Sequence, residues 1–359
     1  MEEQTDKGAL HVMAGVEGNH DGRSISPKKF RKKKQQTIDI PKLAEEVRRG
    51  LRTSLSKAIT LIESSHREHK EQAQKLLQEL LPYTGNSIRI GITGVPGAGK
   101  SSFIEAFGTM LCNLGKKVAV LAIDPSSSLS GGSILGDKTR MEELSRHKSA
   151  FVRPSPSAGT LGGVHKKTRE TMLLCEAAGY DVILIETVGV GQSETYVRGM
   201  VDFFLLLVLT GAGDELQGMK KGIMELADGI IVHKSDGDNM PKAKKTVREY
   251  LQILHFLQPA TPGWISKALP VSSIKKIGLT DVWDMICQFE KTIKDSNYWE
   301  TRRLEQTREW FQSMITDTLI DSFFNNSDKK GQMKSIEKEI LQGEITVTQG
   351  VTKLFAKDH

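Results

Sequence analysis

Cysteine is scarce in this chain, and long hydrophobic runs are missing. The three cysteines, Cys112, Cys175 and Cys287, stand far apart among 359 residues, so they form neither a metal-ligand spacing nor a disulfide framework. A reducing compartment follows. The longest apolar run, Phe203 to Leu209, is much shorter than the about 20 residues that a membrane-spanning helix needs. We therefore expect no association with a membrane.

The first residues, Met-Glu-Glu-Gln-Thr-Asp, are acidic. Secretory signals begin with basic residues, and mitochondrial presequences are rich in arginine and poor in acids. We expect a cytoplasmic protein, or one of the mitochondrial matrix if the chain is eukaryotic.

The net charge of +6 comes mostly from one basic run between Lys28 and Lys34. Nucleic-acid binding is one interpretation of such a run, and a solvated tail is the interpretation that we prefer. Residues 1–37 are polar and lack hydrophobic periodicity, so we expect a disordered arm that binds no nucleic acid.

Periodicity divides the rest of the chain into three parts. Apolar residues recur every three or four positions in residues 38–86, which predicts an amphipathic helical hairpin packed on the next domain, with a partner-binding face as the alternative. Residues 87–290 alternate short apolar runs with helical segments. Residues 291–359 are again helical and rich in large apolar side chains, which indicates a dimerisation or docking arm, or simple packing on the parent domain.

The apolar runs of the middle part predict an α/β fold with a mainly parallel sheet and helices on both faces. The expected strands are Ile88 to Ile92, Val118 to Ile123, Phe151 to Arg153, Val182 to Ile185, Phe203 to Leu209, Gly229 to His233 and Leu269 to Ser272.

A phosphate-binding loop of the form G-x-x-x-x-G-K-S follows the first expected strand and opens a helix. Its glycines let successive backbone N–H groups converge on phosphates at a helix start. We expect Lys100 to reach the β- and γ-phosphates and Ser101 to bind Mg²⁺. The nucleotide-binding residues expected here are Gly94, Val95, Pro96, Gly97, Ala98, Gly99, Lys100, Ser101 and Ser102.

Three carboxylates are candidates for the chemistry at the phosphates. Glu186 ends a buried strand and is followed by Gly189, as in the acid-x-x-Gly element of GTPases, so we expect it to serve Mg²⁺ and hydrolysis. Asp124 ends another strand and is a second candidate for Mg²⁺ or water. Asp137 lies in a glycine-rich segment, where a catalytic role and a loop cap are equally compatible with the spacing.

Base recognition is expected after a later strand. His233-Lys234-Ser235-Asp236 resembles the Asn/Thr-Lys-x-Asp element of GTPases, in which the carboxylate accepts two hydrogens of guanine and the lysine stem covers the ring. We expect Lys234 and Asp236 to bind guanine, with a further contact from Ser272, Ser273 and Ile274. His233 departs from the usual first residue of that element.

Together, these segments resemble the MeaB/ArgK-type P-loop GTPases, which are chaperones of adenosylcobalamin-dependent acyl-CoA mutases and include the methylmalonic aciduria type A protein. The resemblance begins near Lys42 and reaches the C-terminus. Its most specific stretches are residues 94–101, 124–127 with 131–141, 153–156 with 159–164, 185–194 and 213–220.

The resemblance implies a GTPase that uses GTP, GDP and Mg²⁺ and forms a homodimer through the C-terminal arm. It implies slow hydrolysis that methylmalonyl-CoA mutase, or a related acyl-CoA mutase, accelerates while adenosylcobalamin is loaded and protected. Lys100, Asp124, Asp137 and Glu186 would then support Mg²⁺ and hydrolysis. A further switch loop would consist of Asp214, Glu215, Gln217 and Lys220.

Three other functions stay open at this point. A P-loop kinase for a small molecule would need a lid rich in arginine, which is not evident, and Asp236 favours guanine. A binding module without turnover is compatible with the unusual His233. A nickel-inserting GTPase would need a Cys/His cluster for metal storage, and the sequence offers no such cluster.

Overall fold

The computed structural model describes residues 38–64, 66–124, 141–156, 161–187, 193–211 and 221–356. The expected disordered arm, residues 1–37, lies outside the described residues. None of the described helices is long and apolar enough to cross a membrane.

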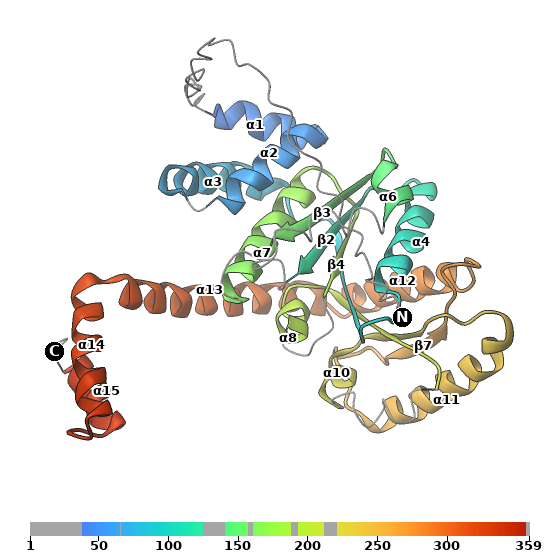
Figure 1. Ribbon diagram of the computed structural model, residues 1–359. Coiled ribbons are helices and arrows are strands. Elements are labelled where there is room, and N and C mark those ends of the chain that lie inside the picture. Colours follow the sequence, from blue (N-terminus) through green and yellow to red (C-terminus); the bar gives the residue numbers. More distant parts are fainter. Residues whose placement is uncertain are drawn as a thin grey trace, which may run out of the picture. The chain divides into compact units, whose positions relative to one another are not determined.

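A sheet of seven parallel strands forms the centre of the fold, in the order β3-β2-β4-β1-β5-β6-β7 (Figure 1). Each run that the sequence predicted as a strand is a strand, with ends that differ by at most three residues. The strands are β1 (Ile88–Gly94), β2 (Val118–Asp124), β3 (Ala150–Pro156), β4 (Val182–Glu186), β5 (Phe203–Val208), β6 (Gly229–Val232) and β7 (Lys267–Pro270). Because all strands are parallel, all their carboxyl ends lie at one edge.

Helices cover both faces of this sheet, as predicted. Alternate residues of β5 show the division: Phe203 packs among the side chains of one face, and Phe204 packs among those of the other. The first face carries α4 (Lys100–Asn113), α6 (Glu142–Arg146) and α12 (Leu279–Asp295). The second carries α7 (Leu161–Ala177), α8 (Ser193–Arg198), α10 (Lys221–Leu226) and α11 (Met240–Phe256).

The N-terminal helical segment also packs on the second face, where it contacts α7. The sequence predicted a hairpin of helices here, whereas the structure divides the segment into three helices. Gly50 has a φ of +73°, and a β-carbon there would stand 3.2 Å from the carbonyl oxygen of Ala178, so the chain turns between the first two. The three helices are α1 (Ile40–Arg48), α2 (Arg52–Glu63) and α3 (Arg67–Leu80), and a short 3₁₀ turn, η1 (Leu81–Tyr83), leads to β1.

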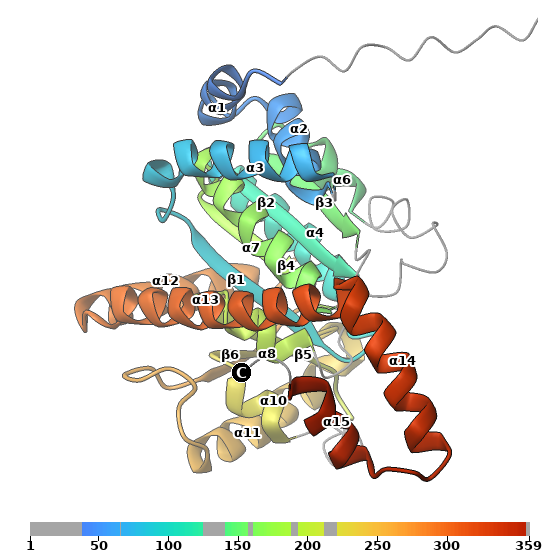
Figure 2. The same ribbon diagram turned by 90° about the vertical axis from the view of Figure 1, so that its left-hand side faces the viewer.

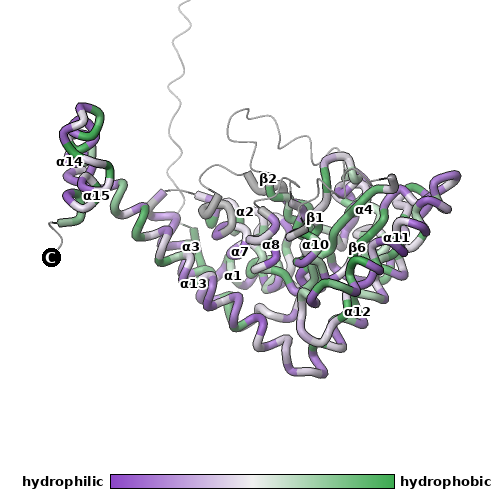
Figure 3. Tube along the Cα trace, turned by 90° about the horizontal axis from the view of Figure 1, so that it is seen from below, coloured by the Kyte–Doolittle hydropathy of each residue, from purple (hydrophilic) through white to green (hydrophobic). Residues whose placement is uncertain are grey.

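The C-terminal part begins with one long helix, α13 (Tyr298–Asn325), and continues with α14 (Ser327–Leu341) and α15 (Val347–Phe355) (Figure 2). Gly343, with a φ of +75°, stands between α14 and α15. Figure 3 shows hydrophilic and hydrophobic residues mixed along α13. The domain boundaries expected from the sequence stay a prediction, and the one at residue 290 falls inside α12.

Three hydrogen bonds of the same kind lie at the amino-terminal edge of the sheet. An aspartate directly before a strand accepts a hydrogen bond from a backbone N–H at the start of a neighbouring strand, which fixes the register of both. The pairs are Asp181 with Lys117, Asp202 with Arg89 and Asp228 with Phe204, at 2.7, 2.8 and 2.9 Å.

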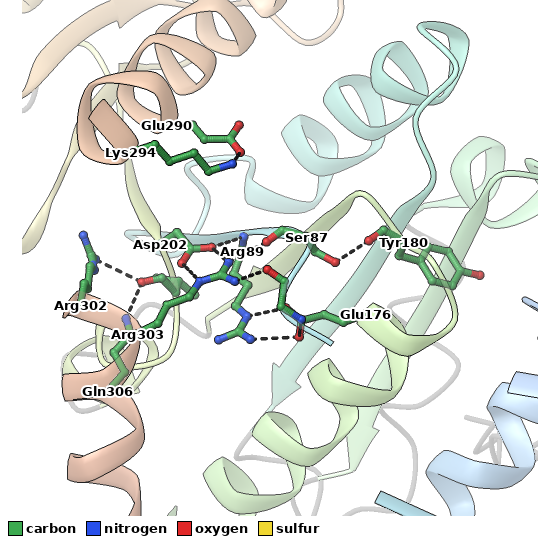
Figure 4. Close-up of polar contacts among 12 residues, drawn as sticks. Ser87, Arg89, Glu176, Tyr180, Asp202, Glu290, Lys294, Arg302, Arg303 and Gln306 are labelled. Atoms are coloured by element: carbon green, nitrogen blue, oxygen red, sulfur yellow. Dashed lines mark hydrogen bonds and ion pairs between the residues drawn. The ribbon is translucent and has the colours of Figure 1, made fainter. Parts of the chain in front are cut away.

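The first turns of α13 are held at this amino-terminal edge by arginine (Figure 4). Arg303 donates to both carboxylate oxygens of Asp202, at 2.9 and 2.7 Å, and to the carbonyl oxygen of Ser87 at 2.7 Å. Arg302 and Gln306 both donate to the carbonyl oxygen of Val201. These contacts join the start of α13 to the loops that precede β1 and β5.

Candidate nucleotide site

The phosphate-binding loop connects β1 to α4 at the carboxyl edge of the sheet. Gly94 has a φ of +151°, and a β-carbon there would lie 2.3 Å from the carbonyl oxygen of Leu207 on β5. Gly99 caps α4 with a left-handed φ of +88°. Glycine is therefore required at both ends of the loop, because a side chain would be strained or would clash. The first N–H groups of α4 point toward this loop, and such groups bind anions.

Lys100 is half-buried, and its ammonium lies against the loop itself. Nζ donates to the carbonyl oxygens of Gly94 at 2.7 Å and Val95 at 3.3 Å. Burial lowers the pKa of Lys100, while the nearby carboxylates of Glu186 and Glu194 oppose this change. Two neutral carbonyls bind an ammonium less strongly than a phosphate does, so the side chain is available to a phosphate that enters the loop.

Ser101 and Glu186 come together from α4 and β4. The Ser101 hydroxyl donates to Oε1 of Glu186 at 2.9 Å, and Glu186 is 9% exposed. Residue 186 pairs with Ile92 of β1, which places this carboxylate beside the phosphate-binding loop. A hydroxyl and a carboxylate side by side are oxygen ligands of the kind that Mg²⁺ prefers, so the pair fits a magnesium ion.

Asp124, the third expected metal ligand, ends β2 at the same edge of the sheet. It stands two positions after Ala122, the partner of Glu186 across the β2–β4 ladder. Its side chain and the whole of Asp137 lie outside the described residues, as do Asp214, Glu215, Gln217 and Lys220 of the expected switch loop.

A buried carboxylate to which the sequence analysis assigned no role lies behind the loop. Glu194, in the first turn of α8, is 1% exposed. Its Oε1 accepts a weak hydrogen bond of 3.4 Å from Thr93, and Thr93 in turn accepts one of 2.8 Å from Thr187. Within the described part of the chain, Oε2 of Glu194 has no hydrogen-bond partner. Glu194 ends the specific stretch 185–194, but its burial depends on where α8 packs, which the sequence pattern does not show.

The expected base-binding residues gather after β6 and β7. Lys234 has a φ of +57°, which turns the chain after β6, and Asp236 is half-buried. The Ser272 hydroxyl donates to Oδ2 of Asp236, and so connects the two turns. Ser273 is buried, whereas Ile274 is 83% exposed on the same turn. Asp236 thus offers carboxylate oxygens that can accept hydrogen bonds from a base with two adjacent N–H donors.

The phosphate loop and the base turn form one site. His233 lies between them, with Nδ1 2.7 Å from the carbonyl oxygen of Ala98 and Nε2 2.6 Å from the hydroxyl of Ser273. The arrangement therefore has the parts to hold a nucleoside triphosphate, with phosphates at Lys100 and a base at Asp236.

Similarity to known proteins agrees with this geometry. The family described as "Methylmalonyl Co-A mutase-associated GTPase MeaB" matches residues 55–328. The chain belongs to the MeaB family. It is similar to the GTPase ArgK of Escherichia coli, with 48% identity over 294 residues, which are 81% of this chain and 89% of that protein. It is also similar to the mitochondrial methylmalonic aciduria type A homolog of Mus musculus, with 43% identity over 347 residues, 94% of this chain and 81% of that protein.

Among solved structures, the crystal structure of an LAO/AO transport system kinase is 37% identical and has a TM-score of 0.72; the match covers 89% of this chain and 97% of that one. The name of that relative mentions a kinase, whereas the family and the relative from Escherichia coli are named as GTPases. Membership of the MeaB family makes this chain a P-loop GTPase that binds GTP and GDP. The kinase and the binding module without turnover, considered from the sequence, are not favoured.

Proposed function

We propose that this GTPase gates the loading of adenosylcobalamin onto methylmalonyl-CoA mutase, or a related acyl-CoA mutase, and protects the loaded enzyme. Its main support is the match of residues 55–328 to a family described as associated with methylmalonyl-CoA mutase. Gating requires that the bound nucleotide changes the affinity for the mutase. The mutase must then change the affinity for that nucleotide by the same factor.

The roles of the site residues belong to the same proposal. Lys100 binds the β- and γ-phosphates once its ammonium leaves the carbonyls of Gly94 and Val95. Ser101 and Glu186 hold Mg²⁺ together with Asp124, and Asp137 joins them in hydrolysis. When bound, Mg²⁺ neutralises charge that develops on the phosphate oxygens.

The mutase dependence is tested by the steady-state rate of GTP hydrolysis, with ATP as the control nucleotide, alone and with methylmalonyl-CoA mutase from the same source. We expect GTP turnover to rise at least about tenfold with the mutase, which corresponds to about 1.4 kcal/mol of transition-state stabilisation. The variant Lys100→Met should lose both rates. An unchanged rate at saturating mutase would contradict the proposed partnership.

Recognition of guanine by Asp236 is tested by Asp236→Asn. The carboxylate accepts two N–H groups of guanine, so the amide should lower kcat/KM for GTP by at least about 100-fold. The amide offers one acceptor and one donor, which match the N–H and carbonyl of xanthine, so hydrolysis of XTP should increase. Asp238→Asn is the matched control, because Asp238 is exposed on the adjacent turn. Equal losses in both variants would reject this role for Asp236.

We also propose that the C-terminal arm joins two copies of the chain, as expected from the sequence. Large apolar side chains remain exposed along α13 in a single chain, namely Leu304, Phe311, Ile315, Leu319 and Ile320. Contiguous apolar surface of this kind marks interfaces. Sedimentation should show a dimer that Phe311→Ser with Leu319→Ser converts to monomer, while Gln312→Ser leaves it intact. A monomeric parent protein would contradict the proposal.

A further inference from the structure

The ring of His233 is buried between the two ends of the nucleotide site. It is 3% exposed and lies directly after β6. One nitrogen faces the carbonyl oxygen of Ala98 in the phosphate loop, and the other faces the hydroxyl of Ser273 in the base turn, at 2.7 and 2.6 Å. The edge-on ring of Phe103, with a centroid distance of 6.3 Å, packs against it.

The two partners determine the protonation state of this ring. A carbonyl oxygen only accepts, so Nδ1 carries a hydrogen and donates to Ala98. Nε2 of the neutral ring can then accept the hydrogen of the Ser273 hydroxyl. Burial lowers the pKa of His233, and Lys234 adds to this, while the Ala98 bond and Asp236 oppose it. A neutral imidazole with hydrogen on Nδ1 satisfies both contacts at once.

The phosphate loop is shaped to receive this ring. A β-carbon at Gly99 would lie 2.7 Å from both Cε1 and Nδ1 of His233, so the ring packs directly on the glycine backbone. Residue 99 also caps α4 with its left-handed φ. The imidazole therefore fixes the loop by a hydrogen bond and by van der Waals contact.

We propose that His233 is a positioning residue that sets the distance and orientation between the phosphate loop and the base turn, so that one guanine nucleotide engages both. The inference rests on the proposed guanine site. Neither Ala98 nor Ser273 can hold the other directly, because the imidazole fills the space between them. A nucleotide that spans both ends binds best when they are already fixed, since ordering them during binding costs affinity.

The variant His233→Leu tests this idea, because it keeps an apolar side chain but removes both hydrogen bonds. We expect the Kd for GTP and for GDP to rise together by about tenfold or more, at the ordinary strength of two hydrogen bonds. The preference for GTP over ATP should fall, because only guanine uses the base turn. The value of kcat at saturating GTP should change by less than about threefold, since the reacting phosphate keeps its own contacts.

His233→Asn is the conservative variant. Its amide can still donate to the carbonyl oxygen of Ala98, so part of the affinity should return. Ser273→Ala removes the other bond alone, and its effect should be small when combined with His233→Leu, because the two changes break one shared contact. His255→Leu on the exposed end of α11 should leave nucleotide affinity unchanged. Thermal unfolding of each variant, with and without GDP, separates lost binding from lost folding.

The inference is overturned if His233→Leu binds GTP and GDP with parental affinity. It is also overturned if the losses of binding free energy from His233→Leu and Ser273→Ala simply add in the double variant. If His233→Leu does not fold, His233→Asn and Ser273→Ala decide the question in the same way. If the proposed guanine site is itself wrong, the result differs: Asp236→Asn would then bind GTP with the affinity of the parent protein.

Discussion

The arginine that holds the start of α13 offers the sharpest stability prediction. Arg303→Met keeps a long apolar stem but removes the guanidinium. Asp202, which is 2% exposed, then loses two charged hydrogen bonds of 2.9 and 2.7 Å and keeps, among the described residues, the hydrogen bond from the backbone N–H of Arg89. The buried carbonyl of Ser87 loses a donor at 2.7 Å. Breaking a buried ion pair from one side costs about 3–5 kcal/mol, and we expect a loss of unfolding free energy in that range.

Urea unfolding followed by tryptophan fluorescence measures this loss, and Trp299 reports directly because the guanidinium lies 4.5 Å from its ring centroid. Arg308→Met is the matched control on the same helix, where the side chain is exposed, and it should change stability by less than about 0.5 kcal/mol. Asp202→Asn combined with Arg303→Met should show a coupling energy of at least about 1.5 kcal/mol. A loss below about 1 kcal/mol for Arg303→Met would refute the reasoning.

Three further predictions concern titration, thiols and the phosphate loop. Burial raises the pKa of Glu170, so its contribution to stability is present below the unfolded pKa and is lost as pH rises through the folded pKa. Glu170→Gln should flatten that decline, and melting temperatures that fall with pH as in the parent protein would contradict this. A thiol reagent should label one cysteine per native chain, the exposed Cys287, and a second fast thiol would contradict the packing. Gly94→Ala should abolish nucleotide binding and lower stability more than Gly97→Ala. The reason is that, of these two substitutions, only Gly94→Ala places a β-carbon against the carbonyl oxygen of Leu207. Equal melting temperatures of the two variants would disprove this.

The strands and the phosphate loop could be predicted because their signals are local. A buried parallel strand is a continuous apolar run, and each run predicted here is a strand. The loop needs glycine at fixed spacings, and the backbone at Gly94 and Gly99 shows why. Ser101 and Glu186 were each expected at Mg²⁺ from separate motifs, and the structure brings their side chains within 2.9 Å of each other because β4 ends beside the loop that opens α4.

Contacts between distant residues could not be predicted in this way. Arg303 and Asp202 are 101 positions apart, and no pattern in either segment indicates the other. Glu194 becomes a buried carboxylate only because α8 packs beneath β1. From the sequence, His233 looked like a departure from a motif, whereas in the structure it makes two short hydrogen bonds. Each of these depends on tertiary packing, which local spacing does not record.

Helix α13 belongs to two parts of the molecule at once. In its first turns, Trp299, Arg302 and Gln306 are buried against the GTPase domain, and the turns beyond carry the exposed side chains of Phe311, Ile315, Leu319 and Ile320. Helix α13 is continuous from the buried turns to the exposed ones. The direction of the exposed apolar surface is therefore fixed by the packing of the first turns and not by a flexible linker. One residue inserted after Gln306 would turn that surface by about 100° about the helix axis while leaving both halves intact. The orientation of the proposed dimer interface relative to the GTPase domain therefore depends on the number of residues between Gln306 and the exposed apolar side chains.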